Sequence, residues 1–242
     1  MLSLENLQLG YKGKVLLDSI NLDIPSGKLT VLVGENGSGK STLLRSLVRL
    51  HKPNMGKVKY GSGTMTEGEN LGMEKEFDVE ELSPTDFAKT IAYVSTEKHS
   101  SMNLSVYDLV ATGRSPYTNW LNELGKEDKK IIEESLHLVG LDKLKHSPTT
   151  EISDGELQRA SIARTLAQDC PIIILDEPTA FLDITNKRSI IRLLKNLCIE
   201  KNKTVILSSH DIETINSADN ILLIKDGGLK SMTADEFNSD DL

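Results

Sequence analysis

A glycine-rich run that ends in a lysine and two hydroxyl residues is the stretch of this chain whose residue types are best suited to chemistry. It spans residues 34–42 and fits the pattern G-x-x-x-x-G-K-[ST]. Its glycines allow successive backbone N–H groups to point into one concavity, and the start of a following helix adds positive potential there. Such a concavity suits phosphate. We therefore predict that a nucleotide binds through Gly34, Asn36, Gly37, Ser38, Gly39, Lys40, Ser41 and Thr42.

Two of these residues have separate chemical roles in a loop of this type. Lys40 is expected to reach the β- and γ-phosphates, and the Ser41 hydroxyl to ligate Mg²⁺. The flanking sequence agrees, because residues 29–33 are apolar and β-branched like a buried strand, and apolar residues recur at helical spacing over residues 43–50. Strand, loop and helix thus come in the order that the loop requires.

A pair of acidic residues follows another apolar stretch, at residues 172–175. Asp176 would stand at the carboxyl end of a core strand, where it suits Mg²⁺ coordination. Glu177 could polarise the water that attacks the nucleotide. Strands often end in acidic residues, so this pair is a weak signal alone. It indicates a nucleotide site strongly only together with the phosphate loop.

The bulk composition limits the classes of function. The 242 residues suit one large domain, and the formal net charge of -8 does not suggest a general nucleic-acid binder. The two cysteines, Cys170 and Cys198, have neither metal-binding nor disulfide-framework spacing, so a reducing cytosol is the simplest setting. No apolar run approaches the roughly 20 residues of a membrane helix, and the start does not resemble a secretory signal. We expect any membrane role to come through a partner.

Strand-like and helix-like segments alternate along the chain, which predicts an α/β domain with a mainly parallel sheet. Residues 104–168 are expected to be helical, and a capping pattern from Thr233 to Glu236 predicts a terminal helix. Residues 61–81 mix glycines with acidic residues and lack apolar periodicity, so we predict a mobile acidic insertion. Strands are expected at residues 2–9, 15–24, 29–33, 57–60, 91–94, 172–175, 204–207 and 221–224.

Over essentially its whole length the sequence resembles the ATP-binding-cassette ATPases. The matching motifs come in that family's order and are Tyr11, residues 34–41, Ile152-Ser153-Asp154-Gly155-Glu156 (where the family has L-S-G-G-Q), residues 172–177, Asp183 and His210. The resemblance implies a phosphate-loop NTPase with a mainly parallel sheet core and an N-terminal antiparallel β subdomain. It also implies a helical subdomain over about residues 98–168 that carries the signature motif, all within one domain, 1–242.

The resemblance further implies ATP and Mg²⁺ as cofactors, and a homodimer that forms head to tail on ATP binding. Each phosphate loop would face the signature residues Ser153, Gly155 and Glu156 of the partner. Tyr11 would stack on adenine and Asp183 would lie at the dimer seam. Glu177 and His210 would be catalytic, with His210 orienting the γ-phosphate and the attacking water.

The chain departs from the family pattern at three positions. Thr96 stands where the family usually has a glutamine that touches Mg²⁺ and water; we expect Glu97 or a bridging water to take over part of that contact. Asp154 replaces a glycine and Glu156 replaces a glutamine. Because none of these changes removes Lys40 or the residues predicted to act on water, we expect ATP hydrolysis.

Residues 106–117, which include Gly113-Arg114-Ser115-Pro116-Tyr117, resemble a segment of cassettes that energise uptake of ferric siderophores, haem or cobalamin. This resemblance implies a subunit bound peripherally at the cytoplasmic face of the cell membrane to separate transmembrane permease subunits, with a substrate-binding protein as an indirect partner. The alternatives are a soluble cassette ATPase outside transport and a nucleotide-sensing cassette with little hydrolysis. No nucleic-acid partner is expected.

Overall fold

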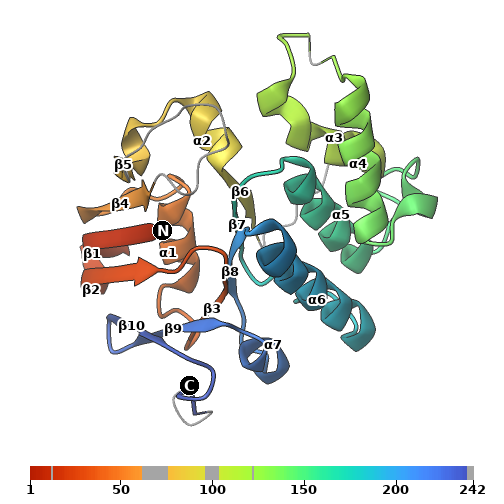
Figure 1. Ribbon diagram of the computed structural model, residues 1–242. Coiled ribbons are helices and arrows are strands. Elements are labelled where there is room, and N and C mark those ends of the chain that lie inside the picture. The colour runs from red at the N-terminus through yellow and green to blue at the C-terminus, as the bar shows by residue number, and fades with distance from the viewer. Residues whose placement is uncertain (12, 62–75, 96–103, 122, 239–242) are drawn as a thin grey trace.

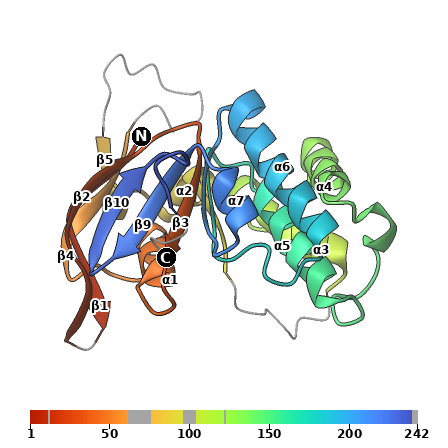
Figure 2. The same ribbon diagram turned by 90° about the horizontal axis from the view of Figure 1, so that it is seen from below.

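Two β-sheets and a group of helices make up the computed structural model, which describes residues 1–11, 13–61, 76–95, 104–121 and 123–238. One sheet has six strands in the order β10-β9-β3-β8-β7-β6, and the other has four in the order β2-β1-β4-β5. Figures 1 and 2 show the four-stranded sheet on one side of the molecule and helices α3 to α6 on the other, with the central strands between them.

The six-stranded sheet is the predicted parallel core. Its parallel strands are β3 (Leu29–Gly34), β6 (Ile91–Val94), β7 (Ile172–Leu175), β8 (Thr204–Ser208) and β9 (Asn220–Lys225), and β10 (Gly228–Met232) runs antiparallel at one edge. Every residue of β3, β7 and β8 is buried. Such continuous apolar strands are typical of a parallel sheet that is covered on both faces.

Alternate residues of these strands enter two different clusters. Val31 and Ile173 pack with α5 (Asp154–Ala167) and α6 (Ile184–Lys201), whereas Leu32 and Ile174 pack with α1 (Lys40–Leu47) and the four-stranded sheet. Since side chains alternate across a strand, these clusters lie on opposite faces of the sheet. Helices α1 and α5 therefore pack on opposite faces.

The four-stranded sheet is antiparallel, and it forms the expected N-terminal β subdomain. Its strands are β1 (Leu2–Tyr11), β2 (Lys14–Ile24), β4 (Met55–Gly61) and β5 (Glu76–Asp78). The hydroxyl of the buried Tyr60 in β4 donates to the Leu47 carbonyl at 2.7 Å. That bond fixes the sheet to the C-terminal end of α1, the helix that follows the phosphate loop.

Residues 104–168 are mainly helical, as expected, but residues 118–121, 123–125 and 145–153 between the helices are not helical. The remaining helices are α2 (Pro84–Thr90), α3 (Val106–Ala111), α4 (Lys126–Leu138), α7 (Ile212–Asn216) and the short 3₁₀ turns η2 (Val79–Glu81), η3 (Thr112–Tyr117) and η4 (Asp142–Leu144). Among the residues that the structure describes, no helix is both long and apolar enough to cross a membrane.

Two local predictions differ from the structure. The described ends of the predicted acidic insertion belong to regular structure, because residues 76–78 pair with β4 and Val79 is only 2% exposed; residues 62–75 lie outside the described residues. The predicted terminal helix is wrong. The Thr233 N–H does donate to Glu236 Oε2 at 2.8 Å, but residues 234–236 form only a turn. A capping contact at one end does not by itself offset the cost of nucleating a helix.

The Gly113-Arg114 segment has a structural role inside the helical region. A Cβ at Gly113 would lie 2.2 Å from the Arg164 carbonyl oxygen, so only glycine allows η3 to approach α5 this closely. The buried Arg114 donates from Nε to Asp128 Oδ1 at 2.8 Å, donates from NH1 to the Ala167 carbonyl at 2.9 Å, and stacks on Tyr117. One guanidinium thus joins η3, α4 and α5.

Asp128 is held as a carboxylate by the same contacts. Burial raises its pKa, but hydrogen bonds from the Arg114 side chain and the Gly125 N–H outweigh burial and lower the pKa overall. The side chains of Arg114 and Asp128 are 7% and 15% exposed, so the pair is largely shielded from water.

We predict that Arg114→Ala lowers the free energy of unfolding by about 3–5 kcal/mol, because it leaves Asp128 without its ion-pair partner in a buried place. The matched control is Lys130→Ala on α4, the helix that carries Asp128; the ion pairs of Lys130 with Glu127 and Glu134 are exposed. Because each such pair contributes about 0.2–0.5 kcal/mol, we expect that control to cost at most about 1 kcal/mol. Urea unfolding of both variants measures the difference, and equal losses would contradict a bracing role for Arg114.

Candidate active site

The phosphate loop connects β3 to α1 as predicted. Gly34 has a φ of 151°, and a Cβ there would lie 2.8 Å from the Ile224 carbonyl oxygen. Glycine is therefore required where the loop leaves β3 beside β9. The loop then exposes Asn36 and Gly37 before Gly39 precedes the first turn of α1.

Lys40 folds back over this loop. Its Nζ donates to the Gly34 carbonyl at 2.7 Å and to the Glu35 carbonyl at 3.0 Å, and the residue is only 9% exposed. An ammonium group has three donors, so one is left for a phosphate oxygen. The Ser38 hydroxyl is also buried and has no hydrogen-bond partner among the described residues. Ser41 is half-buried and Thr42 is buried at the start of α1. The loop thus combines the positioned Lys40 ammonium group with hydrogen-bond donors that have no partner in the described part of the chain.

The acidic pair lies at the edge of the sheet that carries the loop. Asp176 and Glu177 follow β7, and Ser208 ends the adjacent parallel strand β8, which itself pairs with β3. Carboxyl ends of parallel strands share one edge, where α/β proteins bind their ligands. The structure therefore brings the two predicted nucleotide features to one edge.

A single hydroxyl organises the acids. Ser208 Oγ donates to Asp176 Oδ1 at 2.7 Å and accepts from the Glu177 N–H at 2.8 Å. Asp176 is 1% exposed, and its Oδ2 has no hydrogen-bond partner in the described part of the chain. A buried carboxylate oxygen without a partner is costly unless a cation pairs with it. Hard oxygen donors of this kind suit Mg²⁺.

Glu177 and His210 come together as the predicted catalytic pair. His210 Nδ1 lies 3.2 Å from Glu177 Oε1, and the side chains are 75% and 21% exposed. Glu177 has a φ of 48°, which is rare for a residue other than glycine. Such backbone conformations cluster at active sites, and here the Ser208 bond helps to hold it.

The signature residues form the start of α5. Ser153 is the N-cap, its Oγ accepts from the Glu156 N–H at 3.3 Å, and Glu156 Oε2 accepts from the Ser153 N–H at 2.8 Å and hydroxyl at 2.7 Å. The hydrogen bonds from the Ser153 side chain and N–H lower the pKa of Glu156. Asp154 is exposed, so its charge faces outward, and Gly155 lies beside the Phe181 carbonyl.

One chain does not bring the signature residues to its own phosphate loop. Helix α5 packs on the face of the core sheet opposite to α1, and both views show the two helices apart (Figures 1 and 2). Asp183 is also exposed, as the N-cap of α6, where it accepts from the Asn186 N–H at 2.8 Å. Bonds from the Asn186 backbone and then its side chain lower the pKa of Asp183.

Tyr11 is at the tip of the β1–β2 hairpin and is 46% exposed. Its ring centroid lies 4.4 Å from that of His51. The same hairpin approaches the loop, because a Cβ at Gly39 would lie 3.5 Å from Leu16 Cβ. Tyr11 is thus available for a base.

Two residues of the site were not identified by the sequence patterns used above. They are His51, the neighbour of Tyr11, and Ser208, whose position at the end of a strand could have indicated it. Thr96 and Glu97 lie outside the described residues.

Comparisons with known proteins agree with this geometry. A family model described as ABC transporter matches residues 17–180. YusV of Bacillus subtilis (strain 168), named for a siderophore transport system, is 39% identical over 93% of this chain and 77% of its own length. The iron(3+)-hydroxamate import ATP-binding protein FhuC of the same organism is 34% identical over 87% and 73%. A dimeric ATP-binding cassette, MJ0796, solved with ADP and Pi, matches with a TM-score of 0.78 and 28% identity over 98% and 100%.

We predict that Ser208→Ala lowers ATP turnover about 10–100-fold with a smaller effect on ATP affinity, because it frees both Asp176 Oδ1 and the Glu177 N–H. The matched control is Ser231→Ala, whose hydroxyl donates to Asn220 at an exposed position. Steady-state kinetics should separate kcat from KM. A Ser208→Ala enzyme as active as the control would show that the bridge does not position the acids.

Proposed function

Because the chain belongs to the ABC transporter family of ATPases, we propose that it powers a membrane importer for a ferric siderophore, haem or cobalamin. Its reaction is the hydrolysis of ATP to ADP and phosphate. The observation that carries the chemistry is the edge of the core sheet, where Glu177 and His210 lie together beside a buried Asp176.

In this proposal, different residues bind the phosphates, accept the proton and orient the water during hydrolysis. The free donor of Lys40 and the loop N–H groups hold the β- and γ-phosphates. Glu177 accepts the proton of the attacking water, and His210 orients that water and the γ-phosphate. Mg²⁺, when bound, neutralises charge on the phosphate oxygens, and Ser41 Oγ and Asp176 Oδ2 are the groups that would hold it.

The proposal includes a homodimer that forms on ATP binding. It is supported by the separation of α5 from the phosphate loop, which leaves each site without the signature residues of its own chain. The dimeric cassette with ADP and Pi is a precedent for such pairing. Ser153, Gly155, Glu156 and Asp183 of one copy would then face the nucleotide of the other.

The proposal also includes separate permease subunits at the cytoplasmic face of the membrane, and an indirect substrate-binding protein. Support comes from the relatives named for siderophore transport and iron(3+)-hydroxamate import. These names favour a ferric siderophore over haem and cobalamin. They also favour transport over a soluble cassette ATPase with another role.

We predict that Glu177→Gln keeps ATP binding but lowers turnover about 10²–10⁴-fold, because an amide cannot accept the proton from water. The variant should accumulate as an ATP-bound dimer in size-exclusion chromatography. Glu200→Gln, an exposed change on α6, is the control. Turnover of Glu177→Gln equal to that of the control would remove Glu177 from its catalytic role.

The transport proposal predicts that the chain, reconstituted with its permease and binding protein in liposomes, takes up a ferric hydroxamate siderophore when ATP is supplied. Parallel reactions with haem and cobalamin identify the cargo class, and Glu177→Gln gives the background. Uptake of none of the three by an assembly that still hydrolyses ATP would contradict the proposed cargo and leave the ATPase assignment intact.

A further inference from the structure

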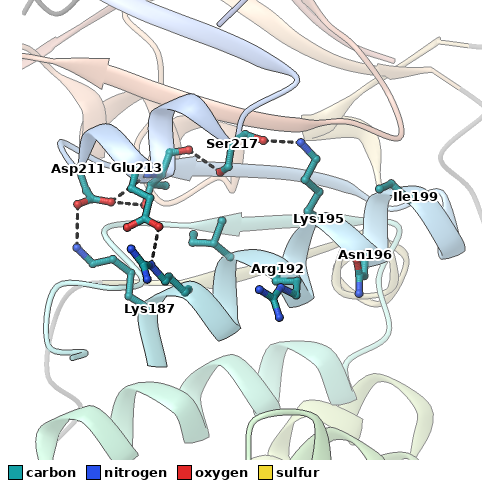
Figure 3. A pocket seen from close by; sticks show the side chains of 11 residues that line it. Lys187, Arg192, Lys195, Asn196, Ile199, Asp211, Glu213 and Ser217 are labelled. Atoms are coloured by element: carbon teal, nitrogen blue, oxygen red, sulfur yellow. Dashed lines mark hydrogen bonds and ion pairs between the residues drawn. The ribbon is translucent and has the colours of Figure 1, made fainter. Parts of the chain in front are cut away.

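A cavity of about 310 Å³ lies between α6 and α7, outside the groups assigned to ATP (Figure 3). Its lining comes from residues 187–199 of α6 and from residues 211–217, which include α7. Known small-molecule sites occupy roughly 300–1,000 Å³. The volume therefore suits a small organic molecule rather than a folded partner.

Three of the four basic side chains in the lining form an ion pair or a hydrogen bond with a residue of α7 or its flanks. Lys187 Nζ lies 3.0 Å from Asp211 Oδ1, and Arg188 Nε lies 2.6 Å from Glu213 Oε1. Lys195 Nζ donates to the Ser217 carbonyl at 2.7 Å. Dashed lines in Figure 3 mark these contacts, which tie α6 to α7 along the cavity.

Arg192 is the remaining cation of the lining. It is exposed, and it has no hydrogen bond or ion pair with any residue in the described part of the chain; Figure 3 accordingly draws no dashed line to it. A guanidinium offers planar, forked donors that match a carboxylate. Lys195 also lies 3.6 Å from Asp219 Oδ1, so each of the other three cations has an acidic partner and Arg192 supplies the positive charge that favours an anion.

Apolar surface lies next to this charge. Ile191 is 7% exposed within the cavity, and Ile199 is 71% exposed at its other end. Ile199 is seven residues beyond Arg192, which corresponds to about 10 Å along α6. A ligand with an anionic head and a short aliphatic tail can thus contact Arg192 and an isoleucine together.

We propose that this cavity binds a small organic carboxylate with a short apolar tail, and that its occupancy alters ATP turnover. The link to the active site is short. Asp211 caps α7 by accepting from the Thr214 N–H at 3.0 Å, and it directly follows His210, which contacts Glu177. A ligand beside the Lys187–Asp211 ion pair therefore acts on the segment that holds His210. The proposal depends on ATP hydrolysis but not on the transported cargo.

Hexanoate is a suitable probe for binding, with hexanol and hexylammonium as controls for the tail and the charge. We expect hexanoate to shift the backbone amide NMR signals of residues 187–217, and the two controls to bind more weakly. Arg192→Gln should weaken hexanoate binding roughly fivefold, in the range of an exposed ion pair. Lys201→Gln, an exposed cation at the end of α6 outside the cavity, should bind like the wild type. No shift in residues 187–217, or equal binding by Arg192→Gln, would overturn the site.

ATP turnover tests the second half of the proposal. Hexanoate should change the turnover of the wild type and of Lys201→Gln, and this effect should be lost in Arg192→Gln, whose turnover without hexanoate should equal that of the wild type. If hexanoate binds in the cavity without changing turnover, the cavity has no influence on His210. Loss of turnover in every variant without hexanoate would instead contradict the ATPase assignment.

Discussion

The Ser208 hydroxyl is the group on which the arrangement of the two acids after β7, Asp176 and Glu177, depends. It donates a hydrogen bond to the Asp176 carboxylate and accepts one from the backbone N–H of Glu177, so one hydroxyl bonds to both residues at once. Asp176 is left with one oxygen free for a cation, and Glu177 is held in a backbone conformation that few residues adopt. The rigid ends of two adjacent parallel strands thus set the geometry of the site. Such positioning is most of what phosphoryl transfer requires from a protein.

The two faces of the core sheet divide the molecule into a half that holds nucleotide and a half that presents the signature helix. The phosphate loop and α1 pack with the antiparallel sheet, whereas α5 and α6 pack on the other face. Asp183 caps the N-terminus of α6, and an ion pair from Lys187 of this helix reaches Asp211, the residue after His210. Groups proposed to act at the dimer seam and at the γ-phosphate are therefore joined through the same pair of helices.

Patterns set by local chemistry could be predicted from the sequence. The phosphate loop, the strand before the acids and the order of strands and helices all follow from short-range spacing, and the structure confirms the fold class. Contacts between distant residues could not be predicted in this way. Ser208 is 32 residues from Asp176, and residues 76–78, just before the buried Val79, pair with β4. The prediction of a terminal helix failed for the opposite reason, since its local capping contact forms but does not by itself offset the cost of helix nucleation.

The burial of Arg114 shows which part of the protein the surrounding segment, residues 113–117, contacts. Its guanidinium is occupied by Asp128, Ala167 and Tyr117 inside the helical region, and Gly113 is fixed by the backbone of α5. All of these contacts lie within the chain itself, between η3, α4 and α5. Residues 113–117 are therefore constrained by how these three helical elements pack together, and the segment is a determinant of internal architecture rather than a recognition element for a ligand.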